Sequence, residues 1–231
     1  MPAGREAWVY ESLVGAVPGL DVTGRTAAAV QFAVFEAGVL VVGGLYGLER
    51  AVVAGTVAVA VAATGSAFML DLGRRLRSLD ASGSYVRLVF GTRIEVVLGL
   101  LAYVALLTYL FVLDPRWGTP LFETLLGPEP PLVAAYLLLL ILWDVCYRIG
   151  TGWWAAVTAL WRTYAGDFDD GTAAALRVAD RRTIAFGLVQ LALVPPVLGH
   201  PVLVTALLGH VVAVLLAAGL SVVRLRRISP T

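Results

Sequence analysis

The sequence predicts an all-α protein, a polytopic bundle of six transmembrane helices with both termini in the cytoplasm. Apolar residues make up 59% of the 231 residues and charged residues only 14%, whereas soluble domains carry about 25% charged residues. Six stretches are apolar over the length of about 20 residues that a hydrocarbon core of about 30 Å requires. The arginines are also unevenly distributed between the segments that connect these stretches.

The six expected spans are separated by short connections. They cover residues 26–48, 51–72, 85–112, 132–150 or beyond, 183–199 and 201–223. Only Glu49 and Arg50 stand between the first two, and His200 with its flanking Gly-Pro joins the last two, so both pairs should be tight helical hairpins. Pro195 and Pro196 should kink or break the fifth span near its outer end. Such a kink is either structural or exposes carbonyl groups to a cavity.

Arginine asymmetry sets the orientation of the predicted spans. One side collects Arg5, Arg25, Arg74, Arg75, Arg77, Arg162, Arg177, Arg181, Arg182, Arg224, Arg226 and Arg227. The other side has only Arg50 and Arg116. Because cytoplasmic loops are enriched in Lys and Arg, both termini are expected inside, in a multi-pass protein of the cell membrane.

Several chemistries are excluded by composition. Lysine is absent, so no Schiff base forms on a side-chain amine. The single cysteine, Cys146, excludes an internal disulfide. His200 and His210 are separated by ten residues of one segment, roughly 15 Å of helix, so one subunit does not hold a bis-histidine haem between facing helices. No cofactor and no metal site are expected, and no basic face suggests a nucleic-acid partner.

The chain divides into three parts. Residues 1–25 form an N-terminal interfacial segment, in which residues 6–17 are expected to form a short helix with Trp8 available to the membrane surface. Residues 26–227 form a single transmembrane domain, and residues 228–231 are a tail. The fourth connection carries Asp167, Asp169 and Asp170. The glycine falls too early for a calcium loop, so this trio favours an N-cap for a cytoplasmic helix at 171–180.

Five polar residues within the spans form a candidate intramembrane core: Glu36, Asp144, Arg148, Gln190 and His210. Ionisable groups at bilayer depth cost about 2.5–3.5 kcal/mol each on insertion scales, which makes each a functional hypothesis. Their depths permit all five to meet. Asp144 and Arg148 share a helix face and can pair, which leaves Glu36 either protonated or matched to His210.

Two interpretations of this core stay open. A buried acid near a titratable imidazole is the minimal equipment of a proton relay. Alternatively, the same groups only hold the helices in register through hydrogen bonds of about 0.6 kcal/mol each. The second interpretation is slightly favoured.

The depth of the segment LWDVCYRIGTGWW, residues 142–154, also has two solutions. If the fourth span ends at Gly150, Arg148 reaches the cytoplasmic surface and Trp153 and Trp154 form the aromatic belt. If the helix continues through Trp161, the charged pair lies near the midplane. The apolar run at 155–160 favours the longer helix.

A separate set of arginines is positioned to contact lipid phosphates at the cytoplasmic surface. These candidate headgroup contacts are Arg74, Arg75, Arg77, Arg181 and Arg182. Neither a nucleophile nor a metal-binding motif accompanies them.

The stretches FGTRIEVVLGLLAYVALLTYLFVLDPR and LILWDVCYRIGTGWWAAVTALWR resemble a family of uncharacterised six-helix membrane proteins of halophilic archaea. The resemblance extends over most of the chain. It implies a six-helix membrane fold and a haloarchaeal source, with no activity, cofactor or catalytic residue attached.

Three functions remain in order of preference. The first is a small transporter or channel component that handles protons, ions or a small solute through the polar core. The alternative is a non-catalytic scaffold or subunit of a larger complex, and the third is a lipid-modifying enzyme. The sequence features together favour a protein that is not an enzyme. The expected partners are membrane lipids and either further copies of the chain or a membrane subunit.

Overall fold

The computed structural model describes Trp8 and residues 24–79, 83–166 and 168–228, and every regular element in these residues is helical. The predicted all-α class is therefore confirmed. Five helices are long and apolar enough to cross a membrane: Thr26–Tyr46, Glu49–Ser78, Ile94–Arg116, Leu132–Ala165 and Pro201–Arg226. The multi-pass character follows from them.

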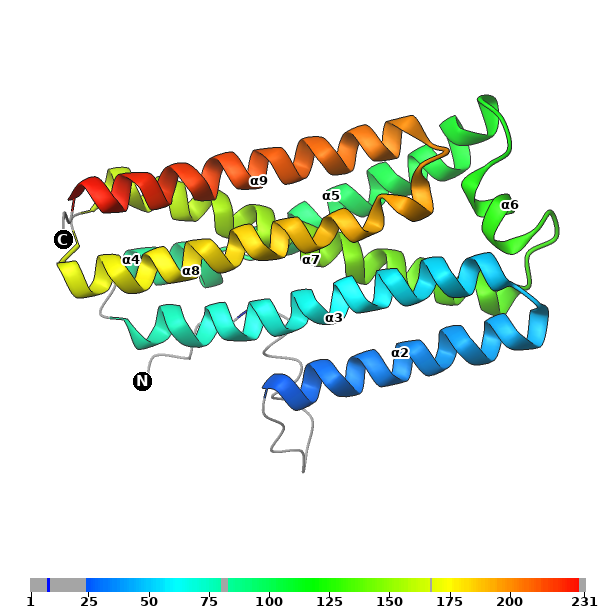
Figure 1. Cartoon of the computed structure of the whole chain (residues 1–231), viewed down its shortest axis with the longest axis horizontal. Helices are drawn as coiled ribbons and strands as arrows, with labels where there is room; N and C mark the ends of the chain where they lie inside the picture. The colour runs from blue at the N-terminus through cyan, green and yellow to red at the C-terminus, as the bar shows by residue number, and fades with distance from the viewer. Residues whose placement is uncertain (1–7, 9–23, 80–82, 167, 229–231) are drawn as a thin grey trace.

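The long helices lie roughly side by side and form a bundle (Figure 1). Helix α7 (Leu132–Ala165) is central, because α5 (Ile94–Thr108), α3 (Glu49–Ser78), α9 (Pro201–Ile228) and α8 (Asp170–Val189) all pack against it. The bundle has two distinct ends. We call the end where α3 and α9 finish and α8 begins the arginine-rich end, and the other, which carries α6 (Leu121–Leu126), the α6 end.

The first two long helices form the tight hairpin that the sequence predicts. Helix α2 (Gly24–Tyr46) is joined to α3 by Gly47 and Leu48 alone. Gly47 has a φ of +65°, a left-handed conformation that glycine adopts without steric cost. Helix α3 extends beyond the predicted 51–72, because Leu76, only 1% exposed, continues its packed face.

The predicted third span, 85–112, is wrong as one continuous helix. A short helix α4 (Gly83–Val86) and a π-helical turn (Arg87–Gly91) precede α5. Between this π-helical turn and α5, Arg93 has a φ of 57°. A residue in the left-handed conformation interrupts a right-handed helix. Helix α5 then continues into a π-helical turn (Tyr109–Leu113) and a 3₁₀ turn (Asp114–Arg116).

The segment between α7 and α9 also differs from expectation. The predicted cytoplasmic helix at 171–180 and the start of the fifth span are one helix, α8. Its predicted N-cap is confirmed, since the Asp169 side chain accepts a hydrogen bond from the Thr172 amide at 3.0 Å. The predicted proline break is found as well. After Val189 the chain tightens into 3₁₀ turns at Gln190–Leu193 and Pro195–Val197, because Pro195 has no amide hydrogen to continue the helix.

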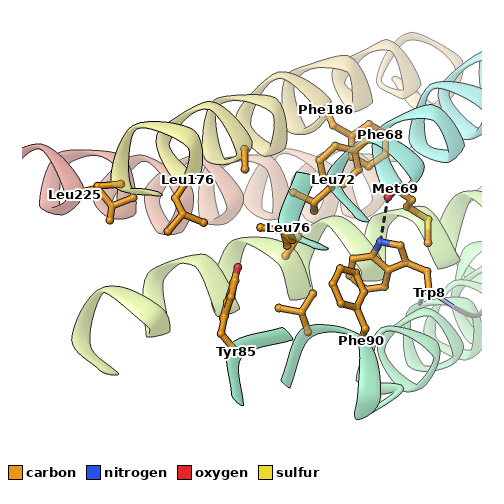
Figure 2. Close-up of a cluster of buried hydrophobic side chains, with 14 of the residues drawn as sticks. Trp8, Phe68, Met69, Leu72, Leu76, Tyr85, Phe90, Leu176, Phe186 and Leu225 are labelled. Atoms are coloured by element: carbon orange, nitrogen blue, oxygen red, sulfur yellow. Dashed lines mark hydrogen bonds between the residues drawn. The ribbon is translucent and has the colours of Figure 1, made fainter. Parts of the chain in front are cut away.

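The largest apolar core lies toward the arginine-rich end (Figure 2). Trp8 is fully buried there rather than at a membrane surface, and its indole Nε1 donates to the carbonyl of Met69 at 3.1 Å. Its ring meets Phe90 edge-on at 4.8 Å between centroids. The remainder of the predicted helix at 6–17 lies outside the described residues.

Helices α5 and α7 approach each other at backbone distance. A Cβ atom added to Gly150 of α7 would lie 2.6 Å from the backbone nitrogen of Gly99 on α5. One added to Gly99 would lie 2.9 Å from the Cα atom of Tyr147. Both obstacles are backbone atoms, so neither substitution is relieved by turning a side chain.

We expect Gly150→Ala to destabilise the protein, because the new methyl group forces α5 away from α7. Overpacking of this kind costs about 1–3 kcal/mol. Thermal unfolding in detergent measures the loss. Gly219→Ala in α9 is the matched control, because nothing lies within 4 Å of its added Cβ. Equal melting temperatures for the two variants would contradict this close approach.

Candidate functional site

The candidate site is built on an ion pair within α7. The Arg148 guanidinium lies 2.9 Å from the Asp144 carboxylate, and the two side chains are 1% and 17% exposed. Helix α7 continues without interruption through Gly150 and Gly152, so the longer form of the fourth span is confirmed. The helix has 34 residues, about 51 Å at 1.5 Å each. The pair lies near the middle of that length.

Side chains from two other helices complete this network. Gln31 of α2 donates from Nε2 to Asp144 Oδ2 at 2.5 Å, and Ser66 of α3 donates to Gln31 Oε1 at 2.7 Å. Arg148 also reaches the sulfur of Met69 on α3 at 2.9 Å. Both carboxylate oxygens of Asp144 therefore have partners. We call these five residues the Asp144 network.

The space around the Asp144 network is small. A cavity of about 10 Å³ adjoins Gln31 and Asp144 and is otherwise lined by apolar side chains. That volume holds about one water molecule. On the other side of Arg148, a Cβ atom added to Gly65 would lie 2.8 Å from the arginine Cβ and 2.9 Å from the Phe186 ring. Gly65 thus allows the arginine stem and the phenyl ring to pack directly on α3.

The other three predicted core residues do not join this network among the described residues. Glu36 accepts a hydrogen bond from Thr56 at 2.8 Å, and its second oxygen is buried without a hydrogen-bond partner. His210 packs beside Trp153, with 6.3 Å between ring centroids. Gln190 is fully buried, and neither amide atom has a hydrogen-bond partner among the residues that the structure describes. Glu36 and His210 therefore do not pair with each other.

Sequence analysis did not identify a second buried network at the arginine-rich end. Arg162 of α7 lies 2.5 Å from Asp180 of α8, and both are about 2% exposed. Arg162 also donates to the Tyr85 hydroxyl at 2.6 Å, and Ser221 of α9 donates to Asp180 at 2.7 Å. These residues, the Arg162 network, tie together α4, α7, α8 and α9. The one feature of the sequence that could have indicated a buried Arg162 is that it follows an apolar run that contains small residues.

A third polar contact, also not predicted, fastens the α6 end. Asp114 accepts hydrogen bonds from the Tyr109 hydroxyl at 2.9 Å and from the Leu121 amide at 2.6 Å. His200 Nδ1 lies 2.8 Å from the same carboxylate. The start of α6 and the connection into α9 are thereby held to the end of the third long helix. We call these the Asp114 contacts.

The five candidate headgroup arginines lie in different surroundings. Arg75 and Arg182 both reach the carboxylate of Asp71, at 2.7 and 3.0 Å. Arg77 packs over the Phe90 ring, 5.6 Å from its centroid. Arg74 and Arg181 are exposed. Of the five arginines, Arg75 and Arg182 therefore meet at one carboxylate.

The apolar helices and their buried polar contacts define a multi-pass helical membrane protein. The chain belongs to the family of unknown function DUF7530, which matches residues 4–221. No curated protein and no solved structure matches the chain. The family agrees with the uncharacterised family that the sequence resembles. The haloarchaeal source and the six-helix count stay predictions.

We expect removal of either partner of the ion pair to cost more than removal of both. Asp144→Asn or Arg148→Met leaves a buried charge uncompensated, which costs about 3–5 kcal/mol, whereas replacing both partners of a buried pair is often nearly neutral. A double-mutant cycle on thermal stability measures this coupling. The control is Arg75→Gln, which removes a partly exposed pair at the same spacing with Asp71 and should change stability by less than about 1 kcal/mol. Strict additivity of the Asp144 and Arg148 variants would contradict the pairing.

Proposed function

We propose that this protein is a non-catalytic membrane scaffold or subunit, in which the buried polar groups hold the helices in one packing arrangement. The observation that carries this proposal is the closure of the Asp144 network. Both carboxylate oxygens and the two terminal nitrogens of the guanidinium have partners on the chain, and the adjoining cavity is only about 10 Å³. This favours the role of polar groups as interhelical hydrogen-bonding partners over their use in transport.

The separation of the ionisable groups supports the same proposal. A proton relay needs groups within hydrogen-bond reach of each other or linked by a water chain. Glu36 contacts Thr56, and His210 lies against Trp153. A cavity large enough for about one water does not connect them.

The proposed topology has six crossings with both termini in the cytoplasm. Helix α7 ends at the arginine-rich end and α9 begins at the α6 end (Figure 1). The chain between them must cover the same distance. This supports a sixth crossing by α8 and the two 3₁₀ turns that follow it, although Arg177, Asp180, Arg181 and Arg182 make α8 more polar than the other long helices. The positive-inside rule places the arginine-rich end in the cytoplasm.

Helix α2 supports a role in assembly. It lies at the edge of the bundle (Figure 1), and its large apolar side chains Val34, Val41 and Leu45 are 64%, 58% and 76% exposed. In a bilayer this face meets lipid, a second copy of the chain or a partner subunit. The Glu36–Thr56 hydrogen bond fixes α2 to α3 and so holds this face in a constant orientation.

One observation favours the second candidate, a transporter. Gln190 is completely buried, and both of its amide atoms lack hydrogen-bond partners in the described part of the chain. An amide in apolar surroundings costs free energy unless it is paired. A conformation that admits water to Gln190 would satisfy it and would also open a polar path beside Gly152, which lies against the same side chain.

Proteoliposomes containing a pH-sensitive dye test the two candidates. Under an imposed membrane potential, we expect the wild-type protein to give the same proton flux as protein-free liposomes, because the cavity beside the Asp144 network holds only about one water molecule. Glu36→Gln and His210→Ala should also leave the flux unchanged. Glu49→Gln, an exposed glutamate at the start of α3, is the control.

A wild-type flux above the protein-free rate, lost in Glu36→Gln or His210→Ala and kept in Glu49→Gln, would reject the scaffold proposal. It would establish the relay in its place.

A further inference from the structure

A groove of about 290 Å³ runs between α3 and α8, toward the arginine-rich end. Its volume is close to the lower limit of about 300 Å³ for small-molecule sites. The residues that decide its chemistry are Ala67, Phe68 and Arg74 of α3 and Arg182, Phe186 and Val189 of α8. The two helices run in opposite directions, so both arginines fall at the same end.

The charged end of the groove has more cations than anions. Asp71 is its acidic residue and already accepts from Arg75 at 2.7 Å and from Arg182 at 3.0 Å. Arg74 lines the groove and has no hydrogen-bond or ion-pair partner in the part of the chain that the structure describes. Arg74 and Arg182 thus line the groove beside one carboxylate, which Arg75 also contacts. The excess positive charge suits a phosphate group, whose oxygens accept several hydrogen bonds from arginine.

Apart from Thr64 at its far end, the rest of the groove is lined by apolar residues. Phe68 and Phe186 line the groove and stack with 4.9 Å between ring centroids, and we call this stacked pair its floor. Figure 2 shows the two side chains lying together. Ala67 and Ala185 are exposed and small, and this leaves the groove open between the helices. Beyond them α8 presents Leu188 and Val189, which are 47% and 38% exposed. From Arg74 to Thr64 the groove follows about 15 Å of helix.

We propose that this groove binds one anionic phospholipid, with its phosphate between Arg74 and Arg182 and a hydrocarbon chain along the Phe68–Phe186 floor. A charged end joined to an apolar channel open at its side matches an amphiphile and not a soluble phosphate compound. This ligand site goes beyond the scaffold proposal. It also divides the predicted headgroup arginines, since Arg77 packs on Phe90 and Arg181 does not line the groove.

Native mass spectrometry of the full chain tests the site directly. The protein is reconstituted with equal amounts of phosphatidylglycerol and phosphatidylcholine, extracted, and analysed for lipid that stays bound. We expect one phosphatidylglycerol per wild-type chain, in preference to phosphatidylcholine. Arg74→Gln with Arg182→Gln should lower retention by about 25-fold, since each basic residue contributes about fivefold to binding of an anionic lipid.

The matched control removes two arginines from the same end of the bundle. Arg181→Gln with Arg226→Gln makes the same change in net charge at exposed positions outside the groove, so phosphatidylglycerol should stay bound. A second pair of variants tests the shape of the groove without changing its charge. Ala185→Trp fills the groove and should abolish retention, whereas Ala174→Trp, at an exposed position of the same helix outside the groove, should not.

Three results would overturn the proposal. Equal losses in the two double-arginine variants would reduce the effect to general surface charge. Wild-type retention in Ala185→Trp would place the lipid elsewhere. Displacement of the lipid by excess inorganic phosphate would mean that the site takes a soluble anion.

Discussion

Helix α7 has to bury two arginine side chains, and the arrangement of the other helices depends on how their charges are neutralised. Arg148 and Arg162 are 1% and 2% exposed. An unpaired charge is very costly in a medium of low polarity, so each needs an anion and further hydrogen-bond partners. Arg148 finds its anion on its own helix, in Asp144. Arg162 finds its anion on α8, in Asp180, so the position of α8 is fixed by the chemistry of α7.

The two solutions have different structural consequences. A pair within one helix leaves the second carboxylate oxygen available to another element, and Gln31 of α2 takes it. The Asp144 network therefore holds the edge helix α2 to α3 and α7. A pair between helices fixes their register, and Ser221 and Tyr85 then bring α9 and α4 to the same point. Two glycines allow the close packing around the Asp144 network, since Gly65 lets α3 approach the Arg148 side chain and Gly150 lets α5 approach α7.

Hydropathy predicted the long helices well because the bilayer imposes their length and apolar character. Local spacing also identified the Asp144–Arg148 pair, since partners four residues apart meet on any helix. The partners of that pair could not be predicted, because Gln31 and Ser66 reach it only through the adjacency of α2, α3 and α7. Arg162 was interpreted as one of many cytoplasmic arginines. The positive-inside rule uses arginines to assign topology and does not distinguish an exposed one from a buried one. The break at Arg93 was hard to predict, because residues other than glycine seldom adopt the left-handed conformation that Arg93 has.

The length of the helices explains why so much of the packed core lies toward one end. Helix α7 is about 51 Å long and a hydrocarbon core is about 30 Å thick, so a substantial part of α7 extends beyond the lipid tails. In the lipid, apolar side chains lose little by facing outward, and α2 and α5 accordingly expose Val34, Leu45 and Leu101. Where a helix extends into water, the hydrophobic effect favours burial of its apolar side chains. Leu76, Leu176 and Leu225 are accordingly buried in one cluster, as in a soluble protein. In the proposed topology, the groove between α3 and α8 has its arginines toward the cytoplasmic side and its apolar floor toward the lipid.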